Sequence, residues 1–99
     1  MRRTRTRPFD AARYLASEQA MAAYFEAALE TGEPSVVAAA LGDLARAKGM
    51  TEVARSAGLG RESLYKALSP DGNPELGTVL RVVAALGLEL RARVAKAGA

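Results

Sequence analysis

The sequence contains no cysteine and no histidine among its 99 residues. Their absence excludes disulfide bonds, thiolate nucleophiles, imidazole bases and the commonest zinc ligands. The acidic residues are spread along positions expected to face solvent, with no inward pair at helical spacing for acid-base catalysis or a metal cluster. We therefore predict a protein that is not an enzyme and has no metal and no cofactor.

Long apolar runs are missing as well. No apolar segment follows the arginines of residues 2–7, so neither a signal peptide nor a twin-arginine export signal is predicted. No stretch approaches the roughly 20 apolar residues that cross a membrane. The length suits one small domain with a single core. The expected location is the cytoplasm, in association with the nucleoid, and no membrane contact is expected.

Charge is present but unevenly distributed. The formal net charge is +3 and the pI is about 9.7. Residues 1–16 carry five arginines against one aspartate, whereas residues 17–34 carry four glutamates and no basic residue. A basic balance is compatible with nucleic acid, although it also fits a merely soluble protein. The acidic second segment argues against a chain wrapped in DNA on every side.

Residues 51–68 have the pattern of a helix-turn-helix, because two short helical runs, 51–57 and 61–68, meet at Gly58-Leu59-Gly60. Ala54 falls where two crossing helices come closest. Gly58 falls where the first helix must stop and the backbone takes a positive φ. The apolar positions expected to share one core are Val53, Ala57, Leu59, Leu64 and Leu68.

The outward side chains of the second run have the chemistry to bind DNA. Arg61 can bridge guanine O6 and N7, and Glu62 can accept from a cytosine amino group or orient Arg61. Thr51 is expected to cap the first run, with its amide near a phosphate. The predicted DNA-binding residues are Thr51, Gly60, Arg61, Glu62, Ser63, Tyr65 and Lys66. The alternatives are that these charges only solvate a helix face and that the Tyr65 ring covers the edge of the core.

Three further helices are predicted from apolar residues at helical spacing, over 17–31, 34–48 and 74–86. Their start signals are Ser17, Pro34 and Asn73-Pro74. The expected core residues are Met21, Tyr24, Phe25, Ala28 and Leu29, then Val37, Ala40, Leu41, Leu44 and Ala47, then Leu76, Val79, Leu80, Val83 and Leu86. The acidic helix over 17–31 either packs only on the domain or also binds a partner.

Residues 88–94 alternate apolar and charged side chains, which is the period of a half-buried strand. No second strand is visible, so we expect this strand to pair with its copy in a homodimer. The alternative is a last helix or a frayed tail. The predicted fold is all-α, a compact bundle of about five helices with a short C-terminal β-strand. It forms one domain over 9–99, after a disordered basic arm, 1–8, that either reaches DNA or is a solvated tail.

Residues 51–88 resemble the phage-repressor (Cro and repressor, XRE-type) helix-turn-helix. The resemblance is carried by the spacing of alanine, glycine and leucine described above and by the run from Asn73 to Leu88. Residues 9–90 resemble, more widely, the addiction-module antidote family of HigA-like antitoxins. The runs that carry this second resemblance are 9–15, 22–32, 39–50 and 64–74.

The resemblance implies a phage-repressor-like fold and an antitoxin of a type II toxin-antitoxin module. Such a protein neutralises a RelE/HigB-like toxin, a small basic ribonuclease, and represses its own operon as a homodimer on an inverted-repeat operator in double-stranded DNA. The resemblance assigns no toxin contacts. From exposed aromatics and charge we expect them at Phe9, Tyr14 and Leu15, beside the helix over 17–31. The alternatives are a stand-alone phage-type regulator without a toxin and a helical protein-interaction module.

Overall fold

The computed structural model describes residues 17–96, and within that range all regular structure is helical. The helices are α2 (Glu18–Glu30), α3 (Pro34–Lys48), α4 (Met50–Ala57), α5 (Arg61–Ala67) and α6 (Leu76–Ala85). The prediction of an all-helical bundle of about five helices is confirmed for these residues. The basic arm 1–8 and the expected partner residues Phe9, Tyr14 and Leu15 lie outside the described range.

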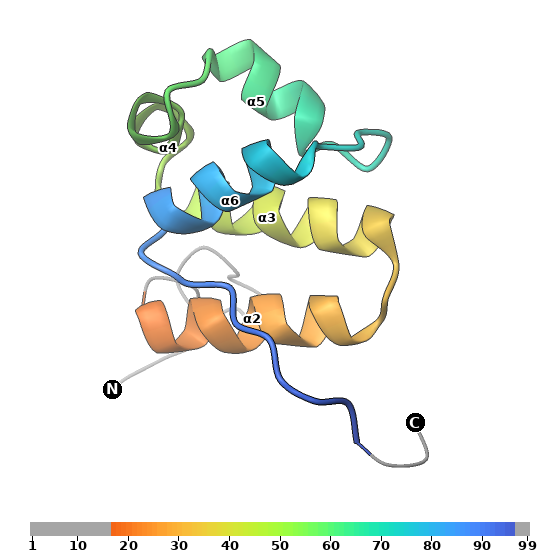
Figure 1. The fold of residues 1–99 in the computed structure, drawn as a ribbon. Helices are drawn as coiled ribbons and strands as arrows, with labels where there is room; N and C mark the ends of the chain where they lie inside the picture. Colours follow the sequence, from red (N-terminus) through yellow and green to blue (C-terminus); the bar gives the residue numbers. More distant parts are fainter. Residues whose placement is uncertain (1–16, 97–99) are drawn as a thin grey trace, which may run out of the picture.

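Helix α3 lies at the centre of the arrangement, in contact with α2, α4 and α6. Figure 1 shows α2 running below α3 as an antiparallel partner, α6 lying along α3, and α4 and α5 at the end farthest from α2. Ser17 caps α2, since its side-chain oxygen accepts the amide of Ala20 at 3.1 Å. Pro34 occupies the first turn of α3, where its missing amide hydrogen leaves no bond unmade.

The core is built on the small residues of α3. Leu41 and Leu44 are fully buried, and alanine or glycine fills the other buried positions of that helix, so the neighbouring helices come close. The other fully buried large side chains come from the three later helices: Val53, Leu64, Leu68, Val82 and Leu86. The end of α6 therefore packs into the same core that holds α5.

The start of α4 differs from the prediction. Gly49 takes a φ of 123° and ends α3 and begins α4 at once, because its amide donates to Ala45 while its carbonyl accepts from Val53. Helix α4 consequently begins at Met50, and Thr51 lies inside it, exposed, rather than capping it. The expectation that Thr51 is the cap was wrong, since a glycine can make the sharp turn that leaves no room for a separate cap residue.

The predicted start of the last helix at Asn73-Pro74 was wrong, because Glu75 keeps an extended backbone with φ −67° and ψ 156° and α6 begins only at Leu76. The inward face is formed by Val82, Val83 and Leu86, with Val79 half-buried. Leu76 is 68% exposed and Leu80 48% exposed, and on α2 Leu29 is 41% exposed. The prediction placed these three leucines in the core and was wrong, because apolar spacing marks a stripe wider than the face that a neighbouring helix covers.

The predicted strand over 88–94 is not seen, since these residues have no regular secondary structure in the single chain. Leu88 and Leu90 are half-buried against the core, where they line a hollow with Phe25. Between them Glu89 accepts from Arg91 at 2.9 Å on the solvent side. The alternation therefore comes from an extended segment that lies across α2 (Figure 1), and the described residues offer it no second strand with which to form a ladder.

Two glycines within helices provide a test of the close packing at α3. A Cβ added at Gly42 would lie 2.9 Å from the carbonyl oxygen of Leu68, whereas one added at Gly77 meets nothing within 4 Å. We expect Gly42→Ala to lower the free energy of unfolding by about 1 kcal/mol, since overpacking outweighs the gain in helix propensity. Gly77→Ala should raise it by up to about 1 kcal/mol. Urea unfolding measures both, and stabilisation by both substitutions would contradict the close approach.

The hydrogen bond between α2 and α3 provides a second test. The Tyr24 hydroxyl donates to Asp43 Oδ2 at 2.6 Å, and this bond, with burial and the carboxylate charge, raises the pKa of Tyr24 above its ordinary 10.0. We expect Tyr24→Phe to lower the free energy of unfolding by about 1 kcal/mol near neutral pH. Because the folded pKa is the higher one, this difference should be present below pH 10 and shrink as pH rises through it.

Urea unfolding of the wild type and Tyr24→Phe between pH 7 and 11 checks the expected difference. Tyr65→Phe is the matched control, since that ring lies exposed on α5 and its loss should change the free energy of unfolding little. A difference for Tyr24→Phe that grows above pH 10 would argue against the bond.

Candidate nucleic-acid interface

Three residues turn the chain from α4 into α5. Gly58 adopts the left-handed conformation, with φ 72° and ψ 32°, at the end of α4. The amide of Leu59 then donates to the carbonyl of Ala54 at 2.9 Å, and Leu59 is half-buried. Gly60 is extended again, and α5 begins at Arg61. Only a residue without a Cβ takes the conformation of Gly58 without strain, so the direction of α5 depends on this position.

Helix α5 has a buried side and an exposed side. Leu64 is fully inaccessible and anchors the helix in the core, and Leu68 does the same just after it. The side chains of this helix that are predicted to contact DNA are all exposed: Arg61, Glu62, Ser63, Tyr65 and Lys66. The helix therefore presents two cations, one carboxylate, one hydroxyl and one phenol on a single outward surface.

Arg61 and Tyr65 contact each other on that surface. The guanidinium carbon of Arg61 lies 5.4 Å from the centre of the Tyr65 ring, and its Nη2 donates to the Tyr65 hydroxyl at 3.5 Å. Tyr65 remains 40% exposed. A cation placed over an aromatic face is attracted by about 0.5–1 kcal/mol at an exposed site. The contact limits the orientations of the Arg61 fork before any ligand is bound.

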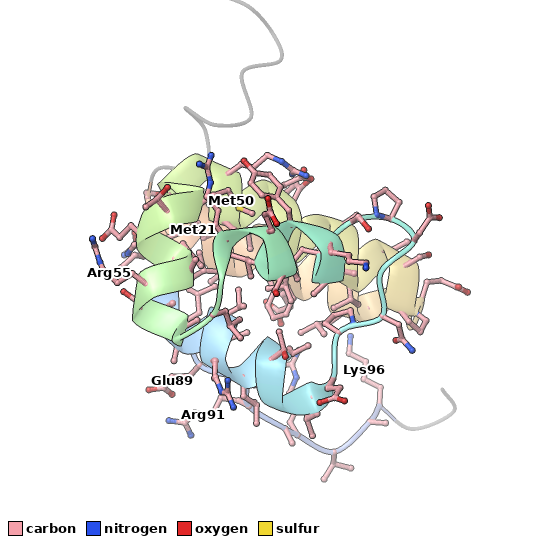
Figure 2. All side chains as sticks on the ribbon, turned by 90° about the horizontal axis from the view of Figure 1, so that it is seen from above. Met21, Met50, Arg55, Glu89, Arg91 and Lys96 are labelled. Carbon is pink, nitrogen blue, oxygen red and sulfur yellow. The ribbon has the colours of Figure 1, made fainter. Side chains whose placement is uncertain are left out.

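A hollow of about 480 Å³ lies beside α5, at the point where α3 ends and α4 begins. Arginines from three helices line it, namely Arg46, Arg55 and Arg61, together with one carboxylate, that of Glu52. Asp43 holds Arg46 in an exposed ion pair at 3.3 Å. Figure 2, which looks down onto α5, shows Arg55 projecting outward from α4. Arginines gathered beside the first turn of a helix favour an anion with several oxygens, such as a phosphate.

The structure brings together only part of the predicted set. Thr51 and Tyr65 line the hollow with Arg61, while Glu62, Ser63 and Lys66 are exposed on α5 without lining it. Gly60 serves as the residue before α5. The prediction missed two lining arginines. Arg46 stands in the last turn of α3, and Arg55 shares the face of α4 that carries Thr51 and Glu52, a signal available in the sequence as a helical repeat.

Charge separates along the molecule. Residues 46–68, which cover the end of α3 with α4 and α5, carry five basic and two acidic side chains. Residues 17–45 carry five acidic side chains and no basic one. Since α2 and α5 lie at opposite ends in Figure 1, the basic surface of residues 46–68 faces away from α2, where Arg93 of the C-terminal segment pairs with Glu26 at 3.4 Å. The end of the molecule that carries α5 is the one suited to a polyanion.

Within residues 17–96, no helix is long and apolar enough to span a membrane. The same range contains no group of three or more acidic side chains placed to hold a metal ion.

Residues 5–94 match a protein family described as "Probable addiction module antidote protein". The chain belongs to this antidote family. It is also 45% identical over 83 residues to an uncharacterized protein of Haemophilus influenzae, an alignment that covers 84% of this chain and 86% of the relative. No solved structure matches the chain significantly. Membership of an antidote family implies a toxin of some kind as partner and an antitoxin role for this chain.

The arginine hollow yields a prediction. If Arg55 neutralises a phosphate, Arg55→Ala should weaken binding to any duplex by a similar factor and reduce the slope of log K against log salt by about 1. Arg91→Ala is the control, because Arg91 lies on the C-terminal segment in an ion pair with Glu89. Fluorescence anisotropy with labelled duplexes at several salt concentrations measures both. Equal losses for the two variants would show that the hollow has no special part in DNA binding.

Proposed function

We propose that this antidote-family chain is a HigA-like antitoxin of a type II module that binds operator DNA and represses transcription of its own operon. The observation that carries the proposal is the exposed surface of α5, where Arg61 stacks on Tyr65 beside a hollow lined by three arginines. Structural helices solvate their outer faces with mixed charges, but they do not need arginines from three separate helices in one place. Membership of an antidote family adds the toxin partner.

In the proposed complex α4 and α5 act as a phage-repressor (XRE-type) helix-turn-helix. A recognition helix enters the major groove with its amino-terminal end first, so Gly60, Arg61 and Glu62 come nearest to the base edges. Arg61 contacts guanine O6 and N7 with its planar fork, and Glu62 accepts from a cytosine amino group. Ser63 and Lys66 then contact the backbone on the outer side. The hollow receives a phosphate at Thr51 and the neighbouring arginines.

A homodimer completes the proposal. Helix α5 has seven residues and spans only a few base pairs, so a single copy reads a short half-site. Two copies related by a twofold axis read an inverted repeat with half-sites about 34 Å apart. Leu76 and Leu80 support a second copy, since both are large apolar side chains exposed one turn apart on α6. This surface replaces the C-terminal strand as the proposed contact between copies.

The toxin we propose is RelE/HigB-like, a small basic protein that the acidic end of this chain complements in charge. The alternative is a stand-alone phage-type regulator without a toxin. The two functions differ in the neighbouring gene that they predict, because an antitoxin of this kind is accompanied by a small open reading frame immediately upstream. If that product co-purifies with the chain, the antitoxin function is supported, and if no such gene exists the stand-alone regulator is favoured.

The DNA-binding half is tested by comparing a duplex from the chain's own upstream region with a random duplex at about 0.15 M salt. We expect a clear preference for the upstream duplex, with two copies bound to each duplex. Arg61→Ala should remove on the order of 1–3 kcal/mol of that discrimination. Lys66→Ala is the matched comparison, since loss of a phosphate contact should weaken both duplexes about equally. Equal affinity of the wild type for the two duplexes would end the repressor proposal.

A further inference from the structure

The strongest unassigned feature is a groove between α2 and α3, away from the arginine hollow. It encloses about 470 Å³ and is lined almost wholly by apolar atoms. Its walls include Ala27 of α2, Val36 and Ala39 of α3, and Pro70 from the connection after α5. Val36 is 40% exposed although it is a large apolar residue. Water therefore covers an apolar surface here that a partner could cover at a gain in free energy.

The two ends of the groove are defined by the antiparallel pair. Thr31 and Ser35 lie at the turn between α2 and α3, and Tyr24 and Asp43, joined by their hydrogen bond, lie at the other end. The floor between these ends consists mostly of alanine. Small side chains let the backbone of an incoming helix approach closely, so the groove suits the apolar face of an amphipathic helix rather than a small polar ligand.

Acidic side chains lie at both ends of the groove, and one of them, Asp43, is already paired with Arg46 at 3.3 Å. Glu30 and Glu33 are exposed on either side of the α2 to α3 turn, and Asp43 lines the opposite end. No lysine or arginine occurs between Ser17 and Ala45 in a chain whose net charge is +3. A helix that places leucine-like side chains on the alanine floor would meet Glu30 and Glu33 near the turn between α2 and α3, whereas Asp43 at the other end is shared with Arg46. Charge complementarity therefore selects a partner with lysine or arginine flanking its apolar face.

We propose that this groove is the toxin-binding site, and that it takes an amphipathic helix of the toxin with basic residues at its edges. The inference rests on the proposed antitoxin function and adds the location and chemistry of the contact. Because α2 lies at the opposite end of the molecule from α5 (Figure 1), a toxin seated here leaves the α5 surface uncovered. One copy of the chain can then hold its toxin and DNA at the same time.

Two alanines of α2 provide a matched pair of variants. Ala27 lines the groove, whereas Ala23, one turn earlier, is exposed and does not line it. Ala27→Arg fills the groove and adds a positive charge to it, while Ala23→Arg adds the same side chain outside it. Each new arginine has a glutamate three residues later, Glu30 or Glu26, and because Glu26 already pairs with Arg93 at 3.4 Å the thermal midpoint of both variants is measured.

The probe is the purified product of the small open reading frame immediately upstream, measured against the full chain by biolayer interferometry. We expect Ala27→Arg to weaken binding by about tenfold or more and Ala23→Arg to leave it within about twofold. The double variant Glu30→Gln with Glu33→Gln should mainly lower the association rate and its dependence on salt. All three variants should keep the thermal midpoint and the operator affinity of the wild type.

The outcomes separate the two proposals. If the wild type binds the upstream product and Ala27→Arg binds it equally well, the groove is not the site, although the antitoxin function stands. If Ala27→Arg instead changes the oligomeric state of the chain alone, the groove is a contact between copies and the inference is overturned. If the wild type binds no upstream product, the antitoxin function falls and this inference falls with it.

Discussion

The close approach of neighbouring helices to the small residues of α3 is the constraint on which the remaining structure depends. Ala38, Ala40, Gly42 and Ala45 are all buried, and at Gly42 the backbone of Leu68 lies too near for an added Cβ to fit without a shift. Leu68 ends the segment that carries α5. The position of α5 is thus set by backbone packing, with little freedom for rotation. The directions in which its exposed side chains point are fixed with it.

The same small residues also produce the apolar groove on the surface between α2 and α3. Alanines along α2 and α3 that pack the two helices closely also line the groove, because a helix rich in alanine has too little side-chain volume to fill the surface between neighbours. Larger residues there would close the groove and separate the helices. The close packing of α2 on α3 and the open apolar groove on their surface therefore both result from the many alanines in these two helices.

Features encoded by local chemistry were predictable from the sequence. Ser17, Pro34 and Gly58 act within one turn of their own positions, and each has the part expected of it. The outward set on α5 followed from the spacing of Leu64 and Leu68, which are buried. These inferences needed no knowledge of neighbouring helices, although Thr51 and Asn73-Pro74, which are signals of the same local kind, do not start the helices expected of them.

Features decided between distant segments were not predictable in the same way. Leu76 and Leu80 have core-like spacing, but the rotation of α6 against α3 and α4 leaves both exposed. The burial expected from the alternation in residues 88–94 holds only for Leu88 and Leu90, which pack on helices, since Ala92 and Val94 are exposed. The arginine hollow was missed for a related reason, because Arg46, Arg55 and Arg61 meet only when three helices are assembled.

Within residues 17–68 the separation of charge gives an electric dipole along the line from α2 to α5, which the C-terminal segment weakens because Arg93 pairs with Glu26 of α2. In the field of a polyanion such a dipole experiences a torque that turns the basic end forward. At physiological ionic strength the field is screened within about 8 Å, so the rotation takes place only in the last part of the approach. If the chain binds DNA as proposed, its collisions with a duplex begin with α5 facing the grooves more often than random orientation allows.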